Sequence, residues 1–554
     1  MYSNKEISTI FKTISGLMEL HGENDFKTKS YSNAAFQIGR IHENVIELDQ
    51  TTLDKKQGIG KSIAAKIIEL RDTGTIAVLD ELMAITPPGL IEILKIKGLG
   101  GKKVGVIWRE LGIETIGELL YACNENRLAK LKGFGEKTQE SVIQSITYYQ
   151  SNQGKFRYAA VAEVANEMVS LFKTAMPNAK IELCGDIRRQ SNIINAIEII
   201  INQDADIQNH IAGFTFLNII STTELAISGK TVNEIAFTIY IVPDATYYFN
   251  LFIKTGAQDF VDTIVTKLNG VTNFESEEAI FKAVQLPFCL PELREDDLIE
   301  IPDQSKLIQL SDIRGIVHNH STWSDGKNTL AEMAEACMNK GFEYFVISDH
   351  SKTAFYAGGL TETQILAQQH EIDQLNDKLK LRIYKSIECD ILFDGSLDYA
   401  DDVLQSFDLV IASVHQNLKM DIDKATNRLL RAIENPYTTI LGHMTGRLLL
   451  SRPGYPVDHK KLIDACAAND VVIEINANPY RLDIDHTQIP YALKKGVMIS
   501  INPDAHSIDG IMDIRWGTVS ARKGGLTKDM CWNSMSLTEV DKWLTSRKKK
   551  KGIS

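Results

Sequence analysis

Apolar residues recur at helical spacing near the start of the chain. The positions lie three or four residues apart: Ile7, Ile10, Phe11, Ile14 and Leu17. Such spacing places side chains on one face of an α-helix. A second amphipathic stretch, KTKSYSNAAFQIGRI, follows at 27–41. We therefore predict helices over residues 4–47, with the apolar face packed in a core.

A different pattern marks the second half of the chain, where short apolar runs alternate with stretches of helical spacing. The runs are YFVIS (344–348), LRIYKSI (381–387), FDLVIAS (407–413), YTTILG (437–442) and VMISINP (497–503). Short, almost wholly apolar runs are typical of strands buried on both faces. Their alternation with helices predicts an α/β barrel of parallel strands.

Each of these runs leads into side chains that can bind metal ions. The residues at the predicted strand ends are His350, Glu388, His415, His443, Asp504 and His506. Upstream, VHNHSTWSDG (317–326) adds His318 and His320, which share one face of a strand, and Asp325 in a turn. Because the C-terminal ends of barrel strands meet at one site, we expect all nine to converge.

The chemistry of this set points to several metal ions. Six histidines, two aspartates and one glutamate are too many ligands for one tetrahedral zinc. They suit two or three hard or borderline divalent ions with Glu388 as a bridge. Clustered ions activate water and stabilise both oxygens of a phosphoester displacement. His370, His459 and His486 lie in helix-like or turn-like segments and are interpreted as ordinary core or surface residues.

The segment 318–506 resembles a PHP domain (polymerase and histidinol phosphatase) in the spacing of all nine positions. GHMTGRLLL (442–450), EINANPYRLD (474–483) and NPDAH (502–506) are similar to segments of PHP domains fused to bacterial family X DNA polymerases. The resemblance implies a distorted (β/α)7 barrel that binds two to three divalent ions, Mn²⁺ or Zn²⁺ or both, with Mg²⁺ as an alternative. It implies catalytic roles for Glu388, Asp504 and His350.

Two arginines stand beside the ligand segments. Arg447 lies in GHMTGR and Arg481 in NPYRLD. Both are candidates to hold a phosphate through charge-assisted hydrogen bonds. The alternative is an ion pair with a structural carboxylate.

Length, charge and cysteine content favour a multidomain cytoplasmic protein. The chain has 554 residues, enough for three or four domains, and a formal charge of −12. Its seven cysteines form no CxxC pair, which suits a reducing cytoplasm. No apolar run approaches a membrane span, and the N-terminus has no signal core. We expect a cytoplasmic, nucleoid-associated bacterial protein without membrane contact. The acidic balance limits nucleic-acid affinity and does not exclude a local basic path.

One short pattern occurs three times in the first 150 residues. The copies are QGIGKSIAAKI (57–67), KGLGGKKVGVI (97–107) and KGFGEKTQESV (132–142). Paired glycines let a backbone approach a phosphate, and a helix N-terminus offers unpaired N–H groups. The pattern resembles the helix-hairpin-helix, although Gly-x-Gly is also a common helix-turn signal. The predicted phosphate-binding residues are Gly58, Gly60, Lys61, Gly98, Gly100, Lys102, Lys103, Gly133, Gly135 and Lys137.

Lys66, in the first copy, matches the Schiff-base lysine of the family X lyase domain, which removes a 5′ deoxyribose phosphate. The basic residue usual four positions earlier is Ser62 here. A solvated surface lysine is the competing interpretation.

Residues 184–201, CGDIRRQSNIINAIEIII, resemble the nucleotide-binding turn and metal strand of family X polymerases. Gly185, Arg188 and Arg189 match the turn. The three positions where the family carries metal-binding aspartates are Ala196, Glu198 and Thr238. Since two-metal phosphoryl transfer needs those carboxylates, we predict a polymerase fold that has lost synthesis.

The resulting domain prediction has four segments. They are a helical DNA-binding region (1–150), a degenerate polymerase palm and thumb of nucleotidyltransferase-like α+β fold (151–300), a linker (301–312) and a PHP phosphoesterase domain (313–548). The terminal RKKKK (547–551) is interpreted as a solvated, disordered tail.

The function predicted from the resemblance is a metal-dependent 3′–5′ exonuclease of DNA repair, with apurinic-site endonuclease or 3′-phosphatase activity as variants. The expected partner is DNA with gapped, nicked or single-stranded 3′ ends, bound by a monomer. Three alternatives stay open: a small-molecule phosphatase of the histidinol-phosphate type, an active family X polymerase, and a non-catalytic DNA-binding scaffold.

Overall fold

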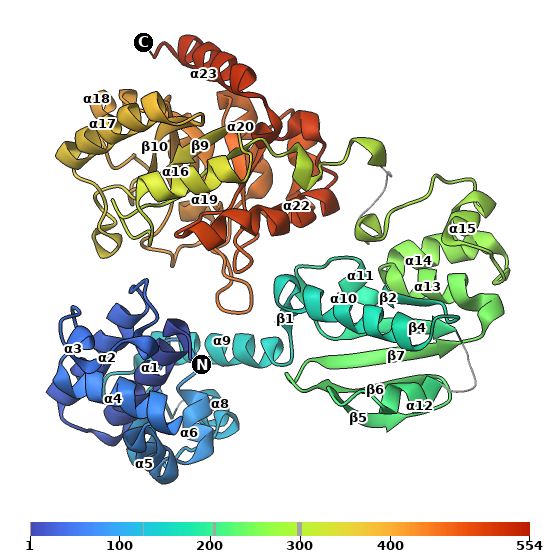
Figure 1. Cartoon of the computed structure of the whole chain (residues 1–554), viewed down its shortest axis with the longest axis horizontal. Helices are drawn as coiled ribbons and strands as arrows, with labels where there is room; N and C mark the ends of the chain where they lie inside the picture. The colour runs from blue at the N-terminus through green and yellow to red at the C-terminus, as the bar shows by residue number, and fades with distance from the viewer. Residues whose placement is uncertain (1, 126, 203–206, 296–301, 554) are drawn as a thin grey trace. The chain divides into compact units, whose positions relative to one another are not determined.

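The computed structural model describes residues 2–125, 127–202, 207–295 and 302–553. The chain folds into two compact units, Met1–Gln153 and Gly154–Ser554 (Figure 1). Among the described residues no helix has the length and apolar character needed to cross a membrane.

In the described residues of the first unit, the regular elements are all helices. Its elements are α1 (Asn4–His21), α2 (Asp25–Ile38), η1 (Val45–Glu47), α3 (Gln50–Leu53), α4 (Lys61–Thr73), α5 (Ala77–Ile85), α6 (Pro88–Ile93), α7 (Gly101–Leu111), α8 (Ile116–Asn124) and α9 (Gly135–Asn152). Helix α1 starts at a capping box, in which Ser3 and Glu6 satisfy each other's backbone N–H groups. Ile7, Phe11 and Ile14 are fully buried. The predicted N-terminal helices are confirmed.

The glycine pairs make the turns between helices in this unit. The first glycine of each copy has a positive φ: Gly58 at 76°, Gly98 at 88° and Gly133 at 92°. A side chain at these positions would be strained. Gly60 and Gly100 are the N-caps of α4 and α7. The backbone N–H groups at the start of each helix therefore come immediately after the glycine pair. In the third copy, Gly135 is the first residue of α9.

The second unit begins with a five-stranded sheet in the order β2-β4-β7-β6-β5. The strands of this region are β1 (Phe156–Arg157), β2 (Ile181–Cys184), β3 (Ile193–Ile194), β4 (Ile197–Asn202), β5 (Leu217–Thr222), β6 (Ala226–Thr231) and β7 (Ala236–Val242). The helices are α10 (Tyr158–Ala175), α11 (Gly185–Arg188), α12 (Ile207–Ala212), α13 (Tyr247–Thr255), α14 (Gln258–Val265) and α15 (Glu277–Ala283). Strands β4 and β7 run parallel, and their isoleucines form much of the local core.

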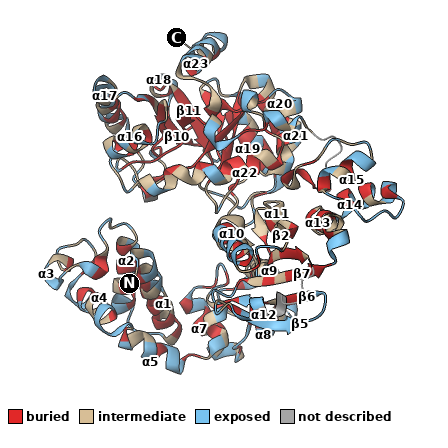
Figure 2. Cartoon of the chain, turned by 45° about the vertical axis from the view of Figure 1, so that its right-hand side comes forward, coloured by how far each residue is buried: buried red, intermediate tan, exposed pale blue. Residues whose placement is uncertain are grey.

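A seven-stranded parallel sheet follows, with its strands in chain order. They are β8 (Gly315–Ile316), β9 (Tyr344–Ile347), β10 (Arg382–Asp390), β11 (Leu409–Ser413), β12 (Thr438–Leu441), β13 (Val472–Asn476) and β14 (Ile499–Asn502). An isolated parallel bridge between Asn319 and Ala505 connects the segments after β8 and β14, so the sheet curls nearly into a barrel. Its strands are almost wholly buried (Figure 2). The predicted barrel is confirmed.

Helices cover the outside of this sheet. They are α16 (Leu330–Asn339), α17 (Glu362–Lys378), α18 (Asp401–Gln405), α19 (Ile422–Glu434), α20 (His459–Asn469), α21 (Ile489–Lys494) and α22 (Ile514–Lys523). Helix α23 (Leu537–Lys551) instead packs on side chains of the inner face, where Val540 and Leu544 join a cluster with Tyr384 and Leu409. A large apolar cluster lies between helices α16 to α22 and the strands. Each ligand-bearing loop therefore starts from a strand that is held on both faces.

The prediction of a disordered RKKKK tail is wrong. Residues 547–551 form the last turns of α23. Arg547 is buried and donates from Nε to the backbone oxygen of Asp470 at 2.9 Å. The aliphatic part of an arginine can pack in a core while its guanidinium donates to backbone carbonyls. The run of five basic residues alone gives no sign of this packing.

The four-segment division of the chain stays a prediction. Residues 300 and 301, where the predicted linker begins, lie outside the described residues. The part of the linker that is described contains two short 3-10 turns, η5 (Gln304–Lys306) and η6 (Leu310–Asp312).

Candidate metal centre

The strands bring the predicted ligand residues to one end of the barrel. His350 follows β9, and Glu388 lies near the C-terminal end of β10. The prediction that His318 and His320 share one face of a strand is wrong: both follow β8, and His318 has a left-handed φ of 64°, which a strand does not allow. The remaining positions sit after later strands: His415 after β11, His443 after β12, and Asp504 and His506 after β14. All strands are parallel, so these positions share the C-terminal edge of the sheet.

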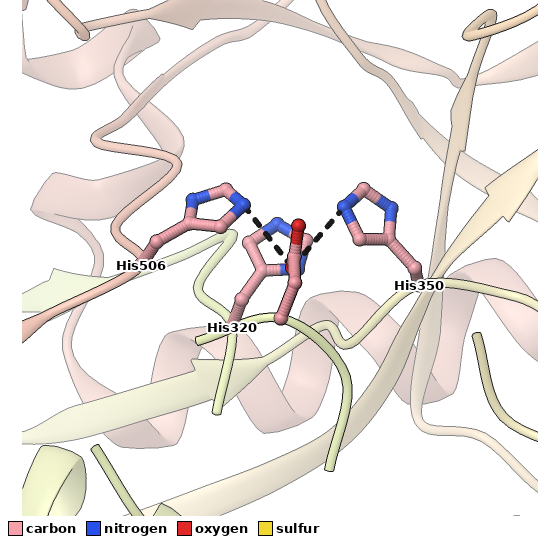
Figure 3. Close-up of side chains that lie close together, drawn as sticks. His320, His350 and His506 are labelled. Carbon is pink, nitrogen blue, oxygen red and sulfur yellow. Dashed lines mark ion pairs between the residues drawn. The ribbon is translucent and has the colours of Figure 1, made fainter. Parts of the chain in front are cut away.

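Ligand-type atoms gather in three overlapping groups. The groups are His320, Asp325, His350 and His506; His318, His320 and Asp504; and His350, Glu388 and His415, with the atoms of each group within 4.8 Å of one another. Figure 3 shows the rings of His320, His350 and His506 close together, each carried by a different segment. His320 and His350 each belong to two groups, so the groups form one continuous cluster.

Glu388 is the centre of this cluster. Its Oε1 lies 3.1 Å from Nε2 of His318, 3.1 Å from Nε2 of His415 and 3.0 Å from Nε2 of His443. Its Oε2 lies 2.9 Å from Nδ1 of His350. One carboxylate thus faces four imidazoles with two different oxygens. This is the geometry that a bridging ligand requires.

The hydrogen bonding of the cluster tests whether it fits metal ions. Within the part of the chain that the structure describes, Nε2 of His318 and Oε2 of Glu388 are buried and, despite the short contacts just given, make no hydrogen bond of suitable geometry. Buried polar atoms are normally hydrogen-bonded. Two atoms bound to one ion at about 2 Å each lie about 3 Å apart, close to the N–O separations around Glu388. The residues present therefore fit a cluster of divalent cations.

Two further carboxylates contact the Nδ1 atoms of imidazoles in the cluster. Oε2 of Glu474 lies 2.6 Å from Nδ1 of His318, and Asp390 forms a short ion pair with Nδ1 of His415. Such contacts fix the ring orientation and leave Nε2 as the ligand atom. The sequence interpretation did not include either carboxylate. The available signal was an acidic residue within a strand that is otherwise apolar, as in VVIEIN (471–476).

Electrostatics keep the central carboxylate charged. Burial alone would raise the pKa of Glu388, but the neighbouring imidazoles, His415 first, lower it well below its usual value. Burial alone would lower the pKa of His415, but Glu388 and Asp390 raise it to about 10. Burial lowers the pKa of His320 to about 3. Glu388 is thus ionised at neutral pH, which is the form that binds a cation.

The two arginines beside the cluster have different surroundings. Arg447 donates from Nη1 to Oδ2 of Asp485 at 2.6 Å and from Nε to the backbone oxygen of Arg481 at 2.9 Å. It therefore makes the structural ion pair that was the alternative to phosphate binding. Nε of Arg481 lies 3.7 Å from Oδ2 of Asp504, at the edge of the cluster. Phosphate binding stays a prediction for both residues.

The polymerase-like site lies on β4 and β7. Glu198 and Thr238 are paired neighbours of the two strands, and Ala196 directly precedes β4. The hydroxyl of Tyr240 donates to Oε1 of Glu198 at 2.9 Å, and burial raises the pKa of Glu198. A Cβ at Gly185 would meet Oε2 of Glu198 at 1.8 Å. The Glu198 side chain thus packs into the Gly185 turn.

The two arginines of that turn are bound within the protein. Arg188 forms an ion pair with Glu277, with Nη2 and Oε2 2.6 Å apart. Arg189 forms a short ion pair with Asp186 and donates to the backbone oxygen of Thr255 at 2.7 Å. Their positive charges are therefore already compensated.

The predicted phosphate-binding lysines lie on the surface of the helical unit. Lys61 and Lys137 are exposed, Lys102 pairs with Asp25 at 2.8 Å, and Nζ of Lys103 donates to the backbone oxygen of Gly98 at 3.2 Å. Lys66, the candidate lyase residue, is less exposed than Lys61 and Lys137. It lies on α4 as a partly buried residue, and its Nζ is 2.6 Å from Oε2 of Glu69. Its lyase role stays a prediction.

Known proteins are similar to this chain over nearly its whole length. The family described as helix-hairpin-helix domain matches residues 2–76, and the family described as SAM-like helix-hairpin-helix tandem matches residues 90–146. These ranges contain all three glycine copies. A DNA polymerase/3′-5′ exonuclease PolX of Bacillus subtilis is 32% identical over 98% of this chain and 99% of its own length.

The barrel also has shorter relatives. Probable phosphatases of Thermoanaerobacter sp. and Thermoanaerobacter pseudethanolicus are each 27% identical over 42% of this chain and 96% of their own length. Together with the barrel, its ligand cluster and the helix-hairpin-helix matches, the full-length similarity shows that the chain belongs to the bacterial family X DNA polymerases that carry a C-terminal PHP domain.

Proposed function

We propose that the PHP domain of this protein is a metal-dependent 3′–5′ exonuclease acting on DNA. The observation that carries the proposal is that eight other ligand-type residues gather with Glu388 at the C-terminal ends of the barrel strands. The relative from Bacillus subtilis is named as a polymerase and a 3′-5′ exonuclease. Three helix-hairpin-helix copies supply a means of holding the DNA backbone.

The proposed chemistry assigns roles to residues of the cluster. When bound, two or three divalent ions would activate a water molecule and stabilise the charge that builds on the phosphate. His318, His320, Asp325, His350, Glu388, His415, His443, Asp504 and His506 would hold them. Glu388 faces the largest number of partners, so its role is to fix the spacing between sites. Asp504 and His350 would orient the scissile phosphate and its attacking water.

We propose further that the palm does not synthesise DNA. Ala196 and Thr238 carry no carboxylate. The remaining Glu198 is hydrogen-bonded to Tyr240 and packs on Gly185. Arg188 and Arg189 are engaged by carboxylates of the protein itself. The loss of both the metal ligands and the free arginines supports a structural role for this module.

The direct test is a nuclease assay with the full chain, Mn²⁺ and a single-stranded DNA labelled at its 5′ end. The expected result is a ladder of products that shorten from the 3′ end and disappear when chelator is added. Degradation that starts at the 5′ end, or none with any of Mn²⁺, Zn²⁺ and Mg²⁺, contradicts the proposal. Substrates with an internal abasic site or a 3′-phosphate separate the endonuclease and phosphatase variants.

A small-molecule phosphatase is the second candidate, favoured by the similarity of the barrel to probable phosphatases. It predicts release of inorganic phosphate from small phosphomonoesters at a higher kcat/KM than nucleotide release from DNA. The helix-hairpin-helix copies favour DNA because a small substrate makes no use of them.

A further inference from the structure

Two phenylalanines are exposed on the loops that carry the metal-binding residues. Phe355 is 80% exposed and Phe393 is 69% exposed. Phe355 follows His350 by five residues, and Phe393 follows Glu388 by five. Both loops leave the C-terminal ends of neighbouring parallel strands, β9 and β10. Both rings thus present an exposed aromatic face on loops that carry candidate metal ligands, and a nucleic-acid base can stack on such a face.

The turn that carries Phe355 is held in place. It is a 3-10 turn, η7 (Phe355–Ala357), closed by a bond from the Gly359 N–H to the Ala354 oxygen at 3.1 Å. Just before it, the Thr353 hydroxyl donates to Oδ2 of Asp390 at 3.0 Å. The turn is thereby attached to the carboxylate that holds His415.

The turn that carries Phe393 is equally well defined. The Leu392 N–H donates to the Ser396 oxygen at 2.8 Å, and the Gly395 N–H donates back to the Leu392 oxygen at 2.9 Å. Gly395 has a φ of 88°, which the tight turn requires. Arg431 of α19 donates to the backbone oxygen of Asp394 at 2.9 Å. Phe393 therefore projects from the tip of a turn that is fastened to a helix.

Arg428 links the two turns to the metal-binding loop after β11. This buried guanidinium donates to the Leu392 oxygen at 2.8 Å and to the Gln416 oxygen at 3.0 Å. The Gln416 amide in turn donates to the Thr353 oxygen at 2.7 Å. Both phenylalanine turns and the loop of His415 thus share one hydrogen-bonded frame. A ligand that stacks on either ring would be placed reproducibly relative to the cluster.

Basic side chains occur on the same set of loops. Lys327, Lys352 and Lys419 are exposed and follow Asp325, His350 and His415 by two, two and four residues. Lys352 forms an ion pair with Glu362 at 2.6 Å, and this pair is half exposed. Lysines and exposed aromatic rings on one set of loops are the combination by which proteins bind single-stranded nucleic acid. The lysines attract phosphates and the rings stack on bases.

We propose that Phe355 and Phe393 stack on unpaired bases at the 3′ end of a DNA strand and so deliver single-stranded or frayed ends to the metal centre. This inference rests on the proposed exonuclease function and adds two residues that position its DNA substrate. A paired end cannot reach the rings until its bases separate, whereas an unpaired end can stack at once. Stacking is tolerant of sequence, because every base has an aromatic face.

A binding experiment tests the stacking without turnover. In the full chain with chelator present, Phe393→Trp places an exposed indole at the tip of the turn. We expect oligothymidylate to quench its fluorescence, measured as the difference from wild type, while an oligomer of the same length with abasic 3′ nucleotides does not. Equal quenching by the two oligomers, or none by either, overturns the proposal.

A kinetic experiment tests its consequence. Phe355→Ala and Phe393→Ala should each raise KM for a single-stranded 3′ end about tenfold, with kcat nearly unchanged. Matched variants at the same positions separate aromatic from merely apolar contact: the tryptophan variants should retain activity and the leucine variants should not. On the abasic-ended oligomer all variants should equal wild type. Leu366→Ala, which removes an aliphatic side chain that is 67% exposed on α17, is the control and should have no effect.

The outcomes distinguish the two levels of inference. If wild type degrades neither oligomer with any divalent ion, the exonuclease proposal fails. If wild type degrades DNA but the alanine or leucine variants are unchanged, the exonuclease stands and base stacking is wrong. If the variants keep wild-type nuclease activity but Phe393→Ala no longer binds a protein that wild type binds, the two rings serve protein binding instead.

Discussion

Nδ1 of His318 lies 2.6 Å from Oε2 of Glu474, although the two residues are 156 positions apart. Both side chains are fully buried. Glu474 also accepts a hydrogen bond from the backbone N–H of His443 at 3.0 Å and one from the Asn502 amide at 2.7 Å. One carboxylate on β13 thus connects three strand ends and directs Nε2 of His318 toward Glu388.

Replacing Glu474 should weaken metal binding without removing a ligand. We expect Glu474→Ala to lower metal affinity about 10- to 100-fold, because the His318 ring loses its orientation. Glu474→Gln, which keeps an acceptor oxygen, should lose less. Chelator competition, followed by metal analysis of the protein, measures the effect. An alanine variant with wild-type affinity would show that the ring is held by packing alone.

Glu388 should be required for metal content and hydrolysis together. Glu388→Ala removes the residue that faces four imidazoles, so we expect the loss of at least one equivalent of metal and of nearly all nuclease activity. Circular dichroism should be unchanged, because buried apolar strands determine the fold. Glu335→Ala, an exposed position on α16, is the matched control. Full metal stoichiometry in Glu388→Ala would contradict the assigned cluster.

The palm should not extend a primer. With Mg²⁺ or Mn²⁺ and all four nucleotides, we expect no product above the reaction without enzyme, because Ala196 and Thr238 cannot bind a cation. The assay should use the Glu388→Ala variant so that the exonuclease cannot erase products. Template-directed extension that persists after Glu198→Gln would refute the alignment of the polymerase positions.

The helix-hairpin-helix lysines should bind DNA without regard to sequence. Replacing Lys61 and Lys137 with alanine together should weaken binding and lower the slope of log affinity against log salt by about two. Fluorescence anisotropy at several salt concentrations measures both quantities. Lys173→Ala with Lys230→Ala, two exposed lysines of the second unit, is the control pair. Equal slopes for wild type and the first pair would remove the phosphate-binding role.

A buried ion-pair network should stabilise the second unit. Glu277 binds Arg188 at 2.6 Å and the fully buried Arg294. Glu277→Gln leaves those charges without a counterion, which costs about 3 to 5 kcal/mol. Glu278→Gln, exposed on the same helix, should cost almost nothing. Chemical denaturation monitored by circular dichroism measures both variants.

The cost should depend on pH. Burial alone would raise the pKa of Glu277, but bonds from Arg188 and Arg294 lower it below the usual 4.5. A lowered pKa in the folded state stabilises the protein above the unfolded pKa, and this contribution disappears as pH falls through the folded value. The difference between wild type and Glu277→Gln should therefore be constant near neutrality and shrink below about pH 4. A difference that grows in acid would contradict the sign of the shift.

Local patterns predicted much of this protein. The spacing of Ile7, Phe11 and Ile14 predicted a helix because periodicity is a property of consecutive residues. The short apolar runs predicted parallel strands, and a parallel arrangement places their C-terminal ends together. The positions of His350, Glu388 and His415 at those ends were therefore accessible from sequence.

Other features depended on residues that meet only in the folded chain. No local pattern connects Glu474 with His318 or Asp390 with His415, yet these carboxylates orient the two rings. Arg447 stood beside a ligand segment, and only the fold showed that its guanidinium is paired with Asp485. The basic tail looked solvated until Arg547 was found buried against backbone carbonyls.

There is a physical reason why some features could be predicted from sequence and others could not. Periodicity, turn glycines and ligand-bearing strand ends are encoded within a few consecutive residues, so the sequence by itself determined the helices, the barrel and the candidate ligand positions. Hydrogen-bond partners are set by which atoms come within about 3 Å after folding, and residues far apart in the chain provide them. Only the tertiary structure decided that Glu474 faces His318 and that Phe355 and Phe393 stand exposed on loops fastened to the same frame.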